Sequence, residues 1–108
     1  MESYRLIFDE VIVHQLKKVA KNPNVREILT KAFNRIEKLG PQAGNLIDSQ
    51  LKLYEIKTKR PPIRLYYKHN LLTNEMYIFE YEMKTSEQKQ QSTINKIKDK
   101  IIRFLLKS

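Results

Sequence analysis

Apolar residues in the first forty positions recur every three or four residues, the spacing of an amphipathic helix. A short apolar stretch at Tyr4–Phe8 predicts a strand before the first helix begins. Asp9 is the expected N-cap of a helix over about Glu10–Lys21, which an Asn-Pro-Asn segment breaks. Asn24 and Glu27 then have the spacing of a capping box, which predicts the start of a second helix.

Beyond Gly40-Pro41, which is expected to end the second helix, the pattern changes from helical spacing to two-residue alternation. Residues 41–50 show neither pattern and are expected to form a loop. Short turns separate the alternating segments, so neighbouring strands should pair antiparallel as a meander. The three predicted strands are Leu51–Lys57, Ile63–Lys68 and Met76–Lys84.

Helical spacing returns in the last twenty residues, over about Glu87–Leu106, with Thr85 or Ser86 as the expected start. The apolar stripe of this helix is Ile94, Ile97, Ile101 and Leu105, widened by Ile102 and Phe104. The order of elements is therefore a strand, two helices, a three-strand meander and a helix. This order predicts one α+β domain over residues 1–108, with the helices packed on one face of a small sheet.

Alternation also predicts which strand residues share a face of the sheet, because successive side chains in a strand point to opposite sides. The face expected toward the helices carries Tyr54, Ile56, Ile63, Leu65, Tyr67, Tyr77, Phe79 and Tyr81. Lys68 and Glu80 fall on the other face, where pairing of the strands should bring together Glu55, Lys57, Arg64, Tyr66, Glu82 and Lys84. This second face is expected to be open to solvent.

The net charge of the chain indicates what kind of partner the polar face could bind. The chain carries 21 basic and 12 acidic residues, a formal net charge of +9. Residues 1–50 hold 8 basic and 6 acidic side chains, whereas residues 51–108 hold 13 and 6. A cation-rich half favours an anionic partner such as a phosphate backbone, an anionic lipid or an acidic protein. The alternative is a solvated, lysine-rich surface without a specific partner.

Several classes of function receive no support from the sequence. The chain has no cysteine, so it has neither disulfides nor a thiolate metal site, in keeping with a reducing cytoplasm. We expect no signal peptide and no membrane contact, since no apolar run reaches the length of a spanning helix. With two glycines there is no phosphate-binding glycine loop. His14 and His69 stand alone, so no metal site and no cofactor are predicted, although His69 could reach the basic face.

The stretch LKLYEIKTKRPPIRLYYKH, followed by YIFEYEMKTSEQK, resembles the RelE/ParE toxin superfamily, nearest its HigB-like, phage-derived branch. That family typically shows a strand of the form aromatic-Arg-aliphatic-x-Tyr and a later strand ending in Phe-x-Lys-Lys-Thr. The corresponding segments here are Ile63-Arg64-Leu65-Tyr66-Tyr67 and Tyr81-Glu82-Met83-Lys84-Thr85. The element order matches over nearly the whole chain, and the motifs cover about Leu51–Lys89.

The resemblance implies a toxin of a type II toxin-antitoxin system that cleaves messenger RNA, in most cases on the ribosome, without a metal. The reaction is attack of a ribose 2′-hydroxyl on the adjacent phosphate, which needs a base, an acid and cations that stabilise the transition state. Arg64 is the expected phosphate clamp, flanked by Lys57 and Lys84. Either lysine could transfer protons, because neighbouring cations lower a lysine pKa. Glu55 and Glu82 could act as base or could hold the cations in place.

Further contacts with RNA are expected from Tyr66, which could stack on a base, and from four cations near the predicted turns and the last helix. These cations are Lys59, Arg60, Lys68 and Lys89. The sequence departs from the family pattern in carrying Lys57 where an arginine is frequent and Met83 in place of the first lysine of the pair. Each assigned residue could instead be an ordinary strand ion pair, a solvated lysine or a cover for the sheet.

Two other functions share the same fold. A ParE-like toxin would act on DNA gyrase and cut nothing, but the cationic set around Arg64 favours RNA. A degenerate toxin retained as a binding module is the second alternative, and the lysine lost at Met83 supports it. The resemblance also implies a cognate antitoxin, normally a small DNA-binding repressor, so no direct DNA contact of this chain is expected. The apolar side chains of Ile102, Phe104, Leu105 and Leu106 would either meet that antitoxin or, as we favour, cover the core.

Overall fold

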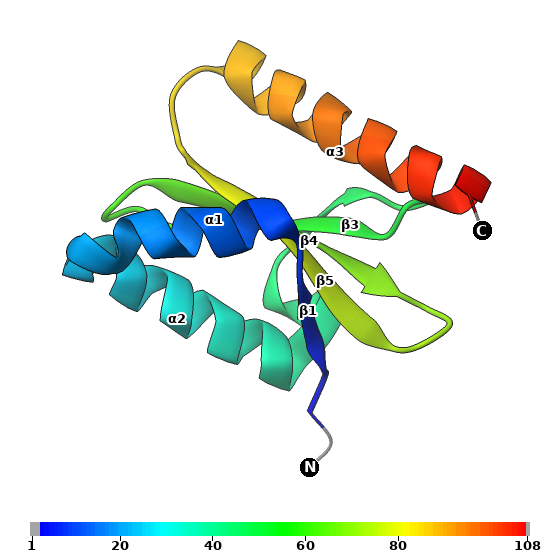
Figure 1. Ribbon diagram of the computed structural model, residues 1–108, viewed down its shortest axis with the longest axis horizontal. Coiled ribbons are helices and arrows are strands. Elements are labelled where there is room, and N and C mark those ends of the chain that lie inside the picture. Colours follow the sequence, from blue (N-terminus) through cyan, green and yellow to red (C-terminus); the bar gives the residue numbers. More distant parts are fainter. Residues whose placement is uncertain (1–2, 108) are drawn as a thin grey trace.

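The computed structural model describes residues 3–107, with side chains for residues 3–104 (Figure 1). The strands form one five-stranded sheet in the order β1-β5-β4-β3-β2. They are β1 (Leu6–Phe8), β2 (Asn45–Asp48), β3 (Leu53–Lys57), β4 (Ile63–Asn70) and β5 (Glu75–Met83). The helices are α1 (Glu10–Lys18), α2 (Pro23–Leu39) and α3 (Glu87–Lys107), with short 3-10 turns η1 (Val19–Lys21) and η2 (Gly40–Ala43). The α+β class predicted from the sequence is confirmed.

The helices cover both faces of the sheet, so the prediction of helices on one face was wrong. The apolar residues of α1 and α2, among them Ile12, Leu29 and Ile36, pack with one face of the strands in a first core cluster. Ile94, Ile97 and Ile101 of α3 pack against the opposite face in a second cluster. Figure 1 shows α3 on one side of the sheet and the α1–α2 pair on the other.

The helix starts follow side-chain capping. Asp9 accepts a hydrogen bond from the backbone N–H of Val11, as the sequence predicts, and Ser86, one of the two expected starts of the last helix, accepts one from that of Lys89. The second helix starts earlier than expected: Asn22 caps the N–H of Val25 and Pro23 occupies the first turn, in place of the capping box.

Two strands differ from the sequence prediction. Residues 41–50, expected as a loop, contain η2 and the edge strand β2, which pairs antiparallel with β3. β1 at the opposite edge pairs parallel with β5, and α1 and α2 lead from β1 across the sheet to β2 at the other edge. The three central strands form the predicted antiparallel meander, and their register aligns Lys57 with Arg64 and Arg64 with Glu82.

A bulge in β5 changes which side chains share a face. Tyr66 pairs with Glu80 but the next residue, Tyr67, pairs with Ile78, so one extra residue of β5 lies between these pairs. Tyr77 and Phe79 therefore pack on the α3 side, whereas Tyr81 packs against the α1–α2 side. The prediction that Tyr77, Phe79 and Tyr81 share one face was wrong for this reason.

Among the described residues, no helix combines the length and the apolar content that a membrane span requires.

Candidate active site

The centre of the predicted polar face is the carboxylate of Glu55, which two cations share. Arg64 Nη1 lies 3.4 Å from Glu55 Oε2, and Lys57 Nζ lies 3.5 Å from Glu55 Oε1. The side chain of Glu55 is only 7% exposed, compared with 19% for Arg64 and 44% for Lys57. Pairing of β3 with β4 places Lys57 directly opposite Arg64, so the pleat brings these two cations together as the sequence predicts.

A second carboxylate, Glu82, lies next to this group because it pairs with Arg64 across β4 and β5. Glu82 Oε2 accepts a hydrogen bond of 2.5 Å from the Tyr66 hydroxyl, and Oε1 accepts one of 2.6 Å from Thr93. Tyr66 is completely buried. Burial, together with the bond to Glu82, raises the pKa of Tyr66, so its hydroxyl stays protonated and acts as a donor.

The polar face is not open to solvent as predicted, because α3 lies across it. Gln90 of α3 donates to Glu55 Oε2 at 3.3 Å, and Thr93 donates to Glu82. Tyr66 packs against the apolar residues of α3, so its ring has no free surface on which a base could stack. Arg64 lies at the border of the covered region, where about a fifth of its side chain stays accessible.

Sequence reasoning missed Gln90 and Thr93 as members of this site. A signal existed, since the apolar stripe of the helix continues at helical spacing from Ile101 and Ile97 back to Thr93 and Gln90. Polar residues in such a stripe face the same surface as the apolar ones. Their hydrogen-bonding groups therefore require polar partners on the sheet.

Four other predicted residues lie around the same end of the sheet. The backbone N–H of Lys84 donates to the Pro62 carbonyl at 2.8 Å, which holds the segment after β5 against the β3–β4 turn. Lys59 and Arg60 are exposed in that turn, and Lys89 is exposed in the first turn of α3. None of the four pairs with an acidic side chain among residues 3–104.

Lys68 and the histidines do not belong to this group. Lys68 Nζ donates to the Leu51 carbonyl at 2.7 Å at the opposite end of β4, and burial together with nearby Lys52 lowers its pKa. His69 is next to it in sequence and binds Asn74 in the β4–β5 turn, so it does not reach the basic face. His14 is exposed on α1. Among the described residues no group of three His, Asp or Glu side chains could hold a metal ion.

Met83 occupies the position where the family pattern has the first lysine of its pair, and the structure shows which face of the sheet this position belongs to. It pairs with Ile63, whose side chain lies in the α1–α2 core cluster, whereas Arg64 and Glu82 pair on the opposite face. A lysine at position 83 would therefore point away from Arg64. The loss of that lysine leaves the cationic group around Arg64 intact.

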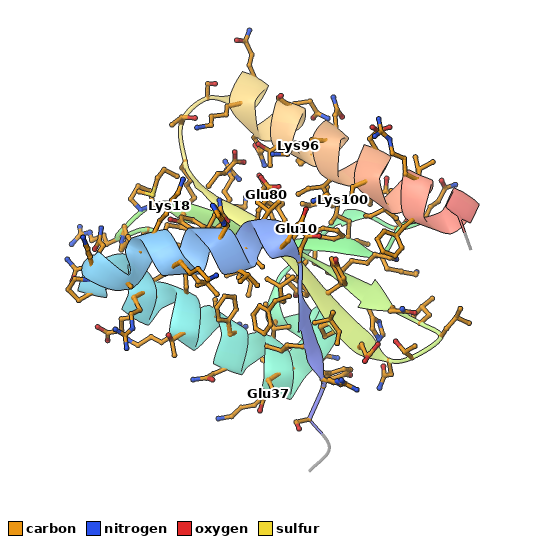
Figure 2. The ribbon with its side chains drawn as sticks, viewed as in Figure 1. Glu10, Lys18, Glu37, Glu80, Lys96 and Lys100 are labelled. Carbon is orange, nitrogen blue, oxygen red and sulfur yellow. The ribbon has the colours of Figure 1, made fainter. Side chains whose placement is uncertain are left out.

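A second polar cluster lies toward the other end of the same face and holds α3 in place. Asp9 accepts hydrogen bonds from the Tyr77 hydroxyl at 2.8 Å and from Lys100 at 3.0 Å. Burial, assisted by the bond to Asp9, raises the pKa of Tyr77 to about 12. Lys96 binds the buried Glu80 at 2.9 Å, and Figure 2 shows both lysines on α3 above β5. Lys98 adds an ion pair with Asp48 of β2.

The apolar end of α3 was expected to cover the core, but Ile102 and Phe104 are 46% and 69% exposed. Leu105 and Leu106 lie outside the residues whose side chains are described. A cavity of about 370 Å³ opens beside Phe104; Tyr77 and Lys100 of the Asp9 cluster contribute to its lining, and Arg64 does not. Its lining consists of Ile7, Lys68, Asn70, Glu75, Tyr77, Phe79, Lys100, Ile101 and Phe104.

Comparison with solved structures reveals clear similarity to one toxin. The isolated E. coli RelE toxin is 22% identical, with a TM-score of 0.63 over 87% of this chain and 98% of that chain. A double mutant of E. coli RelE in the free state is 20% identical, with a TM-score of 0.68 over 88% and 98%. The toxin in the intact E. coli RelBE toxin-antitoxin complex is 24% identical, with a TM-score of 0.62 over 77% and 99%.

Neither a scan against protein-family models nor a search of curated protein sequences finds a match. The solved structures therefore support the fold that the strand motifs imply, while membership of the RelE/ParE superfamily and of its HigB-like branch stays a prediction. At these identities the comparison establishes the architecture. The chain has the fold of the RelE toxin.

Proposed function

We propose that this protein is the toxin of a type II toxin-antitoxin system, a metal-independent endoribonuclease that cleaves messenger RNA on the ribosome. The observation that carries the proposal is the convergence of Arg64 and Lys57 on one buried carboxylate, at the end of the sheet where Lys84 also lies. Structures of RelE with the same fold support the toxin assignment.

The cations supply the chemistry that RNA cleavage needs. When the ribose 2′-oxygen attacks the phosphorus, negative charge accumulates on the phosphate oxygens, and the bond to the 5′-oxygen breaks to leave a 2′,3′-cyclic phosphate. The guanidinium of Arg64 can bind two of those oxygens at once, and Lys57 adds a second positive charge. The 2′ proton must leave and the 5′-oxygen must gain one: we assign removal of the 2′ proton to the amine of Lys84, and donation of a proton to the 5′-oxygen to the ammonium of Lys57, which Glu55 holds in place.

The two carboxylates are better suited to positioning than to proton transfer. Glu55 already accepts hydrogen bonds or ion pairs from Lys57, Arg64 and Gln90, and Glu82 accepts from Tyr66 and Thr93. With both oxygens of each carboxylate already engaged by donors of the protein, neither is directed at a bound RNA. We therefore propose that Glu55 and Glu82 orient the cations and fix the strand ends.

An antitoxin partner is part of the same proposal. One of the structures that share this fold is a RelBE toxin-antitoxin complex. The net charge of +9 suits an acidic partner segment, and the exposed Ile102 and Phe104 offer apolar surface for it. DNA contact would then belong to the antitoxin and not to this chain.

The test is inducible expression of the wild-type protein and of Arg64→Ala in a bacterial host, followed by mapping of RNA ends. Arg103→Ala is the matched control, because Arg103 is also a guanidinium but is 75% exposed and pairs only with Asp99 on the outside of α3. We expect growth arrest and new messenger RNA ends for the wild type and for Arg103→Ala, and neither for Arg64→Ala.

Other outcomes identify the alternatives. Growth arrest with DNA damage and without new RNA ends would favour a ParE-like toxin that acts on gyrase. Absence of arrest for the wild type, with the protein folded and free of antitoxin, would favour a degenerate toxin. The placement of Met83 away from Arg64 removes the main sequence argument for that last alternative.

A further inference from the structure

The positive charge of the molecule divides into cations that are paired and cations that are not. On α3, Lys96, Lys98, Lys100 and Arg103 each form an ion pair with a carboxylate. The unpaired cations include Lys17, Lys18, Lys21, Arg26, Lys59, Arg60, Lys84 and Lys89, none of which has an acidic partner among residues 3–104. All of these except the half-buried Lys84 are exposed.

The unpaired cations of α1 and η1 lie at the same end of the molecule as Arg64. α1 runs alongside β5 in the same direction, since Asp9 N–H donates to Ile78 and the side-chain amide of Gln15 both donates to and accepts from the backbone of Tyr81. Three residues of helix advance about 4.5 Å beyond Gln15, so Lys18 reaches the level of the last residues of β5.

The β3–β4 turn lies at this end as well. β4 begins there opposite the end of β5, and Lys84 N–H is bonded to Pro62 of the turn. Figure 1 shows the turn close to the end of α1 in this view, and Figure 2 labels Lys18 in that half of the helix. The end of α1, η1, the β3–β4 turn and the segment after β5 thus lie at the same end of the sheet as Arg64, with α1 and η1 on the side away from α3.

Acidic residues are scarce in these segments. The sequence from Val11 to Arg26 contains four lysines and arginines and no aspartate or glutamate, and none occurs from Ile56 to Asn74 either. The exposed acids next to these segments are Glu10, Glu27, which pairs with Lys31, and Glu87 at the start of α3. Positive charge without neighbouring carboxylates produces a local field that attracts an anionic chain, which paired surface charges do not.

We infer that Lys18 and Lys21, with Lys17 and Arg26 beside them, form a second RNA-binding surface that holds phosphates flanking the one bound by Arg64. The inference rests on the proposed function for the position of the scissile phosphate. RNA fits better than an acidic protein because these exposed cations lie at the same end of the sheet as Arg64, the residue proposed to bind the scissile phosphate. Such lysines bind a phosphate backbone at successive positions, regardless of sequence.

The experiment measures binding of a fluorescein-labelled, fully 2′-O-methylated 12-nucleotide RNA, which lacks the 2′-hydroxyl and is not cleaved. Fluorescence anisotropy gives the affinity at several salt concentrations for the wild type and for Lys18→Gln/Lys21→Gln. Each phosphate contact to a single strand contributes about 0.7 to the slope of log affinity against log salt, so this variant should lose about 1.4. Its affinity near 0.1 M salt should fall about tenfold.

The matched control is Lys38→Gln/Lys52→Gln, which removes the same charge from the opposite end. Lys38 is in the last turn of α2, and Lys52 precedes the start of β3, far along the strand from Lys57. We expect the control to keep the wild-type slope. Equal losses in both variants would show attraction by net charge alone, and an unchanged slope in the Lys18/Lys21 variant would show no contact; either overturns the inference.

A separate arm uses a glutamate-rich peptide with the charge of the RNA. Weakened peptide binding with unchanged RNA binding would assign the surface to an acidic protein and would also overturn the inference.

Since the RNA cannot be cleaved, the result is independent of the expression experiment with Arg64→Ala. Weaker RNA binding by the Lys18/Lys21 variant would support the second surface even if the protein cut no messenger RNA. Unchanged RNA binding by this variant would reject the second surface but would not argue against cleavage at Arg64. Thermal unfolding of both variants checks that they fold alike.

Discussion

Two polar clusters on the same face of the sheet are built from the same kinds of residues but differ in their surroundings. In the Asp9 cluster, a buried carboxylate receives a tyrosine hydroxyl, a lysine and a backbone N–H. In the Arg64 cluster, Glu82 receives the Tyr66 hydroxyl, and neighbouring Glu55 receives an arginine and a lysine. Both clusters are contacted by α3.

The difference lies in what remains available for a ligand. Lys100 is committed to the single carboxylate of Asp9. Around Arg64, the carboxylates of Glu55 and Glu82 balance Arg64 and Lys57, and unpaired cations such as Lys59 and Lys84 add positive charge at the same end of the sheet. A pair with balanced charge stabilises the fold, whereas excess positive charge beside a half-buried guanidinium can bind an anion. Both clusters contain a buried carboxylate, so the carboxylate alone does not indicate the role of the cluster. The charges around it indicate whether the cluster can bind an anion or only stabilises the fold.

The largest difference between the clusters is expected in the cleavage rate, when arginine is replaced by lysine in the Arg64 cluster and lysine by arginine in the Asp9 cluster. Arg64→Lys keeps the charge but loses the planar fork, so cleavage of a defined RNA by the purified protein should fall about 100-fold. Lys100→Arg also keeps the charge and should leave the rate unchanged. Initial rates measured side by side test this. Equal losses in the two variants would show that both clusters act only through the fold.

Removing the carboxylate of the Asp9 cluster should mainly affect stability. Asp9→Ala loses the cap of α1 and the bonds to Tyr77 and Lys100. We expect the free energy of unfolding in urea to fall by about 3 kcal/mol, with the cleavage rate per folded molecule retained. Loss of cleavage in protein that is still folded would mean that the two clusters are coupled through α3.

Removing the hydroxyl of Tyr66 or of Tyr77 should change the free energy of unfolding by a smaller amount, and by a different amount in each cluster. Tyr66→Phe leaves Glu82 with Thr93 as its remaining hydrogen-bond donor in the described structure, whereas Asp9 keeps Lys100 and Val11 N–H in Tyr77→Phe. Urea unfolding should show a loss of about 2 kcal/mol for Tyr66→Phe and about 1 kcal/mol for Tyr77→Phe. The reverse order would indicate that Glu82 gains new partners when the hydroxyl is removed.

The smallest expected effect is on the pH dependence of stability. Burial alone would raise the pKa of Asp9, but hydrogen bonds from Val11, Lys100 and Tyr77 together hold it below 3.8. Because the folded-state pKa is lowered, this stabilisation is present above pH 3.8 and is lost as the pH falls through the lowered pKa. Unfolding measured from pH 6 to pH 2.5 should be less pH-dependent for Asp9→Asn than for the wild type. Identical curves would assign the acid sensitivity to other carboxylates, such as Asp48.

The sequence alone determined much of the local structure. Alternation placed Glu55, Lys57 and Arg64 on one face of the sheet, because side chains in a strand point alternately to opposite sides whatever the strand packs against. The caps at Asp9 and Ser86 followed from their own side-chain oxygens. The helical stripe of Ile94, Ile97 and Ile101 predicted the buried face of α3. These features depend on interactions between residues close in the sequence or on the geometry of one element.

Only the tertiary structure decided which surface α3 would cover, because either face of the sheet offered apolar residues to its stripe. The bulge in β5 then moved Phe79 to the α3 side, and α3 brought Thr93 onto Glu82. The placement of the unpaired lysines of α1 at the same end of the sheet as Arg64 also joins segments far apart in the chain. Local spacing carries no information about such contacts, since they depend on how whole elements pack.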